Sequence, residues 1–145
     1  MLLDTERKSR EDAKRENPVA LAYLGDAVFT LYVRARLVKN GNAKPSDLQR
    51  TSAKIVSARW QSEWLETLLP RLTEEEMEVF RRGRNAKKPT KSKSASAGEY
   101  NRSTGLEAVL GFLYLAGDES RVKELLSGID ESAFEVEKGA TAFKP

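Results

Sequence analysis

Apolar residues along this chain recur every three or four positions, which is the period of an amphipathic α-helix. Helix start and stop signals bound these segments, such as Asn17-Pro18 before the first and Pro70 after the second. The predicted helices span about 18–39, 46–68, 73–82, 104–115 and 119–127. No stretch of five or more residues alternates cleanly between apolar and polar, so we expect no β-sheet and an all-α fold.

The predicted organisation is a single helical domain over residues 17–127. A polar N-terminal segment, residues 1–16, precedes it, and a C-terminal tail, residues 128–145, follows it. Within the domain, residues 86–102 are rich in Ser, Lys and Ala and have no hydrophobic period, which predicts a mobile basic loop.

Two carboxylates stand in apolar helical runs without a base three or four positions away, Asp26 in LAYLGDAVF and Glu107 in STGLEAVLGFLYL. An unpaired carboxylate in such surroundings must be exposed, find a distant partner or hold a cation. Gly25 inside a helix indicates close packing against another element, so Asp26 beside it either pairs with a distant arginine or is functional. For Glu107 the alternative is structural, because Thr104-x-x-Glu107 fits a helix capping box.

The absence of two residue types narrows the chemistry. With no His and no Cys, the chain lacks imidazole acid–base catalysis, thiolate nucleophiles and thiolate or imidazole metal sites. Any metal must be held by oxygen ligands, which favours Mg²⁺, with Mn²⁺ as an alternative. The lack of Cys suits a reducing cytoplasm. The longest apolar run, 19–33, is short and contains Asp26, so we expect no membrane span.

Positive charge is concentrated in one region although the net charge is only +3. Between residues 81 and 102 there are eight bases and one acid, which points to a polyanionic partner. The structural alternative is a solvated last helical turn, where cations complement the helix dipole. The residues predicted to contact the phosphates of such a partner are Arg81, Arg82, Arg84, Asn85, Lys87 and Lys88.

Taken together, the segments LAYLGDAVFTLYV, AKIVSARWQSEWL, RRGRNAKK and STGLEAVLGFLYL resemble the catalytic domain of ribonuclease III from about residue 17 to 127. The chain departs from the usual family pattern at two positions. Ala22 stands where a glutamate is usual, and Thr104 stands where an aspartate is usual, so half of the metal-binding carboxylates are missing. The chain contains the motif GRNAK, and we expect no room in it for the double-stranded-RNA-binding domain that usually follows. In both features the chain resembles the Mini-III branch of the family.

This resemblance implies a helical homodimer that cleaves double-stranded RNA to 5′-phosphate and 3′-hydroxyl ends. It implies 23S ribosomal RNA precursor as the substrate, with assistance from a ribosomal protein left open. It also makes Asp26 and Glu107 the catalytic and metal-binding residues, with Glu63 as a reserve carboxylate and Thr104 as a holder of water. Two alternatives remain at this point: a catalytically silent binder of double-stranded RNA, and a structural dimerisation domain.

Overall fold

The computed structural model describes residues 7–88 and 95–136, and all regular secondary structure in these ranges is helical. The elements are α1 (Arg10–Arg15), α2 (Pro18–Lys39), α3 (Pro45–Ile55), α4 (Ala58–Leu68), η1 (Leu69–Arg71), α5 (Glu74–Asn85), α6 (Ala97–Leu115), α7 (Glu119–Leu126) and η2 (Glu131–Phe134). The predicted all-α fold is confirmed. No helix in the described ranges combines the length and the apolar character that crossing a membrane requires.

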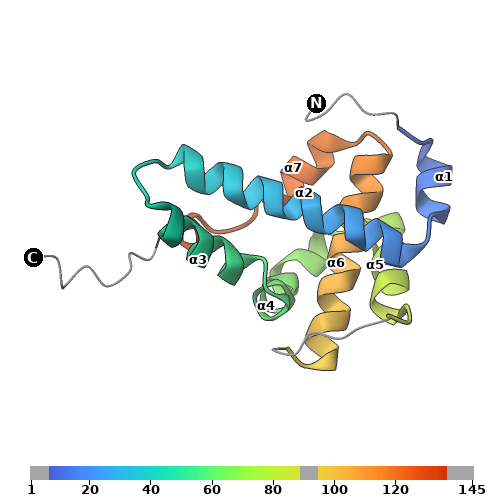
Figure 1. Cartoon of the computed structure of the whole chain (residues 1–145). Helices are drawn as coiled ribbons and strands as arrows, with labels where there is room; N and C mark the ends of the chain where they lie inside the picture. Colours follow the sequence, from blue (N-terminus) through green and yellow to red (C-terminus); the bar gives the residue numbers. More distant parts are fainter. Residues whose placement is uncertain (1–6, 89–94, 137–145) are drawn as a thin grey trace, which may run out of the picture.

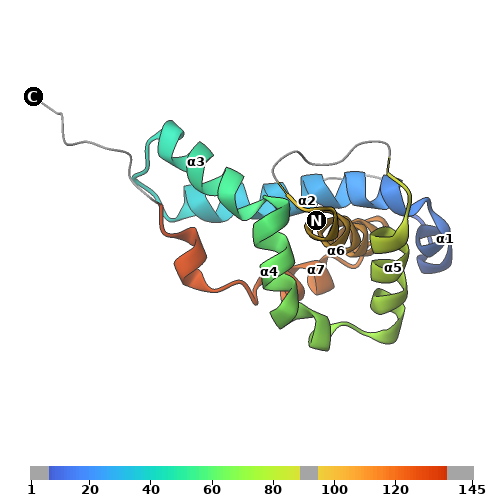
Figure 2. The ribbon, with the colours of Figure 1, turned by 90° about the horizontal axis from the view of Figure 1, so that it is seen from below.

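Helix α6 is the centre of the molecule. Figure 2 looks almost along its axis and shows α2, α4 and α5 arranged around it, and all three helices contact it. Its buried face includes Leu106, Leu110, Phe112 and Leu113, none of which is more than 1% exposed. Helix α2 runs the length of the molecule across α6 (Figure 1), so the two longest helices meet at a single crossing.

Helix α2 begins and ends where the sequence predicts. The Asn17 side chain accepts hydrogen bonds from the backbone N–H groups of Val19 and Ala20, and Pro18 occupies the first helical position. An N-terminal proline needs no hydrogen-bond acceptor and has the helical φ already set. The start of α5 is likewise confirmed, because Thr73 and Glu76 form a complete capping box.

The predicted helix over 46–68 is wrong, because the segment forms two helices. Helix α3 ends at Ile55, and the Ser57 side chain caps α4 by accepting from the N–H of Trp60. The same hydroxyl donates to the carbonyl oxygen of Lys54 at 2.8 Å. The apolar spacing continues across this break, so periodicity alone could not reveal it.

The predicted start of the next helix at Thr104 is also wrong. Helix α6 begins at Ala97, where Ser96 and Glu99 form the capping box, so residues 97–102 of the predicted loop are helical. Thr104 lies within the helix, and its hydroxyl donates to the carbonyl oxygen of Tyr100 at 2.9 Å. Residues 89–94 of the predicted loop lie outside the described residues.

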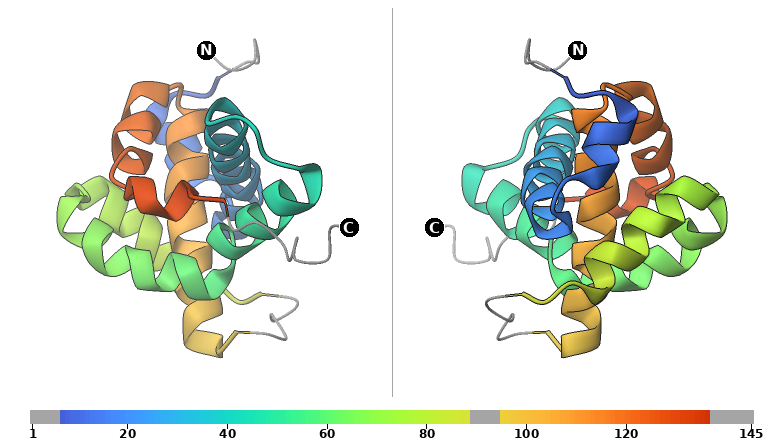
Figure 3. Two further views of the ribbon diagram at one scale, coloured as in Figure 1. Left: turned by 90° about the vertical axis from the view of Figure 1, so that its left-hand side faces the viewer. Right: turned by 90° about the vertical axis from the view of Figure 1, so that its right-hand side faces the viewer.

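The domain limits of 17–127 remain a prediction. Packed structure is present before residue 17 and after residue 127. Helix α1 contacts α6 at one end of the molecule (Figure 3) and is fastened by the Arg82 guanidinium, which donates to the carbonyl oxygens of Lys14 and Glu16. Beyond residue 127, η2 buries Phe134, whose ring lies 4.4 Å from the Arg36 guanidinium carbon.

Candidate active site

The two predicted catalytic carboxylates lie together because two glycines allow α2 and α6 to touch backbone to backbone. A Cβ atom on Gly25 would lie 1.7 Å from the carbonyl oxygen of Glu107, and one on Gly111 would lie 1.9 Å from the carbonyl oxygen of Leu21. Any side chain at either position would separate the helices. Asp26 follows Gly25 and Glu107 lies one turn before Gly111, so the crossing brings their carboxylates together.

The environment of Glu107 keeps its carboxyl group protonated well above the usual range. Burial, and then the charge of Asp26, raise the pKa of Glu107 to about 8. Asp26 also accepts a hydrogen bond from the protonated form, while a hydrogen bond from Gln61 acts in the opposite direction. Asp26 itself is exposed and forms no ion pair with any described residue, so the alternative of a distant arginine partner is wrong.

Gln61 is a member of this site that the sequence did not reveal. It lies on α4, is 0% exposed, and its Nε2 donates to Oε2 of Glu107 at 3.2 Å. In sequence it is a polar residue between Trp60 and Ser62 on an amphipathic helix. Only the packing of α4 against α6 brings it to Glu107.

The donor set at the crossing suits a hard divalent cation. Two carboxylates, one of them protonated because it is buried beside the other, gain from a cation that neutralises both. In the described ranges no group of three or more Asp, Glu, His or Cys side chains is arranged so that it could hold a metal ion, and the pair is not joined by a third acid. Glu63 does not join the pair, because it is exposed and lies 3.7 Å from Arg59.

The predicted RNA-contacting residues divide into two groups. Arg82 is engaged with α1, and the Lys88 ammonium donates to the carbonyl oxygens of Arg84 and Ala86, where burial lowers its pKa. Arg84 lies over the ring of Phe80 and donates to Asn85. Arg81 and Lys87 form no hydrogen bond or ion pair with the described residues and are exposed.

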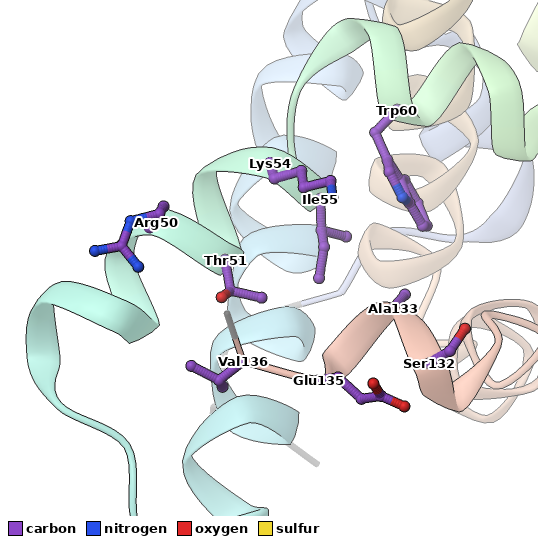
Figure 4. A pocket seen from close by; sticks show the side chains of 9 residues that line it. All are labelled: Arg50, Thr51, Lys54, Ile55, Trp60, Ser132, Ala133, Glu135 and Val136. Carbon is purple, nitrogen blue, oxygen red and sulfur yellow. The ribbon is translucent and has the colours of Figure 1, made fainter. Parts of the chain in front are cut away.

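A cavity of about 300 Å³ lies elsewhere, between α3, the start of α4 and η2 (Figure 4). Arg50, Lys54, Trp60 and Glu135 are among its lining residues, and neither Asp26 nor Glu107 contributes to it. The carboxylate pair is therefore not part of this cavity: Asp26 is exposed on the surface, and Glu107 beside it is partly buried.

Comparison with known proteins identifies the family. The family model described as "Ribonuclease III domain" matches residues 19–118. The chain belongs to the ribonuclease III family. Membership confirms the resemblance found in the sequence and makes the chain an endoribonuclease of a family that is metal-dependent and acts on double-stranded RNA.

Several curated ribonuclease III relatives cover most of the chain. Mini-ribonuclease 3 from Symbiobacterium thermophilum is 49% identical over 75% of this chain and 84% of its own length. Mini-ribonuclease 3 from Brevibacillus brevis is 41% identical over 88% of this chain and 92% of its own length. The crystal structure of protein FN1578 from Fusobacterium nucleatum superposes with a TM-score of 0.71 at 30% identity, covering 80% of this chain and 93% of that one.

Proposed function

We propose that this chain cleaves double-stranded RNA by Mg²⁺-dependent hydrolysis, giving 5′-phosphate and 3′-hydroxyl ends, with Asp26 and Glu107 as the metal-binding catalytic residues. The observation that carries the proposal is the glycine crossing, which sets two carboxylates side by side, and no cationic side chain among residues 7–88 and 95–136 pairs with either of them. Mn²⁺ satisfies the same oxygen ligands and should replace Mg²⁺.

The two carboxylates have two roles in the reaction: they bind the metal ion, and one of them accepts a proton. Asp26, the exposed member of the pair, is the principal ligand and the acceptor of the proton that the attacking water must lose. Glu107 must lose its own proton before it can serve as the second ligand, so the burial that raises its pKa delays its charging until a cation is near. When bound, a divalent cation supplies electrostatic relief to the phosphate and lowers the pKa of water.

A pair of carboxylates is a small ligand set, so we expect weak metal binding without RNA and activity that needs millimolar Mg²⁺. Glu63 has no assigned role in this mechanism, since Arg59 pairs with it. The hypothesis that Thr104 holds water finds no support in its contacts, because its hydroxyl proton is donated to Tyr100 and its side chain is buried.

We assign the RNA contacts to residues at the end of α5 and directly after it. Of the predicted set of Arg81, Arg82, Arg84, Asn85, Lys87 and Lys88, we give the leading part to Arg81 and Lys87, whose charges are not engaged by the described residues. Arg84 can still offer guanidinium donors, whereas Arg82 and Lys88 fasten the protein's own carbonyl groups. Duplex RNA would be recognised by its A-form backbone, with little reading of bases.

The finer biological setting belongs to the same proposal. We place the enzyme in the cytoplasm as a homodimer that matures 23S ribosomal RNA precursor, with a ribosomal protein as a further partner that shapes the substrate. The Mini-ribonuclease 3 relatives, which match across most of their own length, support this assignment.

The test compares the protein and its Asp26→Asn variant on long double-stranded RNA, each with Mg²⁺ and with EDTA. We expect short fragments only from the unaltered protein with Mg²⁺. Cleavage by the variant at an undiminished rate would overturn the assignment of Asp26. RNA that stays intact but shifts on a native gel, including the ribosomal precursor, would favour the silent binder, which the two missing acids make the second candidate.

The RNA surface is tested by the salt dependence of binding. The double variant Arg81→Ala, Lys87→Ala should reduce the slope of log K against log salt by roughly 2 and leave the melting temperature unchanged. The control Arg82→Ala should leave the slope nearly unchanged and lower the melting temperature, since it frees α1. The reverse result would show that the two groups have been assigned the wrong way round.

A further inference from the structure

The side chain of Gln61 is a buried amide between α4 and α6, where an apolar residue would be the usual choice. It is 0% exposed, and its Nε2 donates both to the carbonyl oxygen of Val56, at 3.0 Å, and to Oε2 of Glu107, at 3.2 Å. Gln61 therefore connects the end of α3 directly to one of the proposed metal ligands.

The orientation of this amide follows from its partners. The Val56 carbonyl oxygen can only accept a hydrogen bond, so Nε2 and not Oε1 must face it. The second hydrogen of the same nitrogen is then directed to Glu107, whereas turning the amide over would set Oε1 against the Val56 carbonyl oxygen. Gln61 is thus fixed as a donor to the Glu107 carboxylate.

Burying the Gln61 amide has a cost in free energy, and packing alone does not explain why the protein accepts it. Oε1 of Gln61 is buried and has no hydrogen-bond partner in the described ranges. A methionine has nearly the same length, would fill the same space and would leave no buried amide oxygen unsatisfied. The amide is therefore better explained by the two hydrogen bonds that its nitrogen donates, to the Val56 carbonyl oxygen and to Glu107, than by the volume that it fills in the core.

We propose that Gln61 is a positioning residue that holds the Glu107 carboxylate by Oε2, so that the group is presented beside Asp26 in the orientation that a divalent cation requires. This inference rests on the proposed nuclease function. Without the contact, the Glu107 side chain would sample other rotamers, and the cation would find two carboxylates that are not aligned. Outer partners of metal ligands commonly contribute about 10- to 100-fold to metal affinity or activity.

The experiment compares Gln61→Met with Ser57→Ala, a matched control at the same helix junction. Ser57 caps α4 through hydrogen bonds with the backbone of Lys54 and Trp60, and within the described ranges it makes no hydrogen bond to Asp26 or Glu107. We expect Gln61→Met to lower kcat for duplex RNA by about 10- to 100-fold with KM changed less than about twofold. Ser57→Ala should lower the melting temperature and leave kcat unchanged.

Metal binding is measured separately from cleavage, by Mn²⁺-induced broadening of amide NMR signals in the RNA-free protein. The apparent dissociation constant for Mn²⁺ should rise by about tenfold or more in Gln61→Met and stay constant in Ser57→Ala. Unchanged Mn²⁺ affinity and kcat in a folded Gln61→Met variant would overturn the proposal. So would parallel losses in both variants, which would mark the residue as part of the junction alone.

If Gln61→Met does not fold, the unaltered protein still decides the question. Both side-chain amide protons of Gln61 should exchange slowly and broaden at the same Mn²⁺ concentrations as the backbone amide of Glu107. Absence of that broadening would overturn the proposal. A failure of the proposed function is a different result, because the unaltered protein would then cleave no duplex RNA at all.

Discussion

Two glutamates of this molecule have opposite surroundings: Glu76 is buried beside an arginine, and Glu107 is partly buried beside another acid. Glu76 is 1% exposed and accepts from Nε and Nη2 of Arg121 at 2.8 and 2.9 Å and from the N–H of Thr73. Burial alone would raise the pKa of Glu76, but these partners outweigh it and hold the pKa below its usual value. Glu107 has an amide and a second carboxylate as neighbours, and its pKa is raised to about 8.

The difference separates a carboxylate that supports the fold from one that is available for chemistry. Every oxygen of Glu76 is used by the protein, so its charge is balanced in the folded chain. No described residue balances the negative charge of ionised Glu107, and the neighbouring Asp26 carboxylate repels that charge. A folded protein tolerates such a site where a ligand from outside completes it.

The largest expected effect is on cleavage. Glu107→Gln should lower kcat on the order of 10³-fold, because it removes one of two ligands and several kcal/mol of transition-state stabilisation. The fold should be kept or stabilised, since the new amide oxygen can still accept from Gln61 and no longer opposes Asp26. Single-turnover cleavage and urea unfolding check this, and a variant that is inactive only because it is unfolded would refute it.

The crossing of α2 and α6 that creates the site should not accommodate an added side chain. Gly25→Ala places a methyl group on the carbonyl of Glu107 and should reduce the free energy of unfolding by about 3 kcal/mol or more. Gly98→Ala is the control, because its Cβ would meet only the Ser96 side chain, at 3.9 Å, and should stabilise α6 by up to about 1 kcal/mol. Equal stabilities of the two variants in urea would contradict the backbone contact.

Removing the paired glutamate should have the opposite consequence to removing the unpaired one. Glu76→Gln leaves Arg121 with a half-buried charge and should reduce the free energy of unfolding by about 3 kcal/mol. Below its melting temperature the variant should keep the kcat of the unaltered protein. Loss of kcat in a folded Glu76→Gln protein would remove the distinction between the two glutamates.

The pH dependence of stability should have opposite signs for the two glutamates. The pKa of folded Glu107 is raised from 4.5 to about 8, so its contribution is fully present at acid pH and is lost as the pH rises between these values. With one proton of difference, stability should fall by about 2 kcal/mol from pH 6 to 7.5 in EDTA. Glu76, whose pKa is lowered, contributes above its unfolded pKa and loses this only at acid pH.

Urea unfolding at the two pH values, in the unaltered protein and in Glu107→Gln, measures this directly. The decrease should disappear in the variant and be reduced by Mg²⁺ in the unaltered protein. A decrease of the same size in the variant would assign it to other groups.

How well a helix start could be predicted depended on whether its sequence signal acts locally, within one turn of the chain. Asn17-Pro18 and Thr73-x-x-Glu76 act within one turn of the chain, and both predicted helix starts are found. Ser96-x-x-Glu99 is an equally local signal that identifies the true start of α6, whereas Thr104-x-x-Glu107 imitates a capping box in the middle of a helix. A four-residue pattern cannot tell a helix start from a helix interior, because the deciding hydrogen bonds are made by the turn before it.

The sequence by itself determined the all-helical class, the exclusion of His and Cys chemistry, and Asp26 and Glu107 as the candidate acids. These follow from residue identity and from spacing along one helix. Only the tertiary structure decided that Gly25 and Gly111 touch, that Gln61 donates to Glu107, and that Arg82 fastens α1 while Arg81 stays exposed. Those contacts join residues far apart in the chain, and no periodicity within a helix specifies which neighbour a side chain meets across a packed interface.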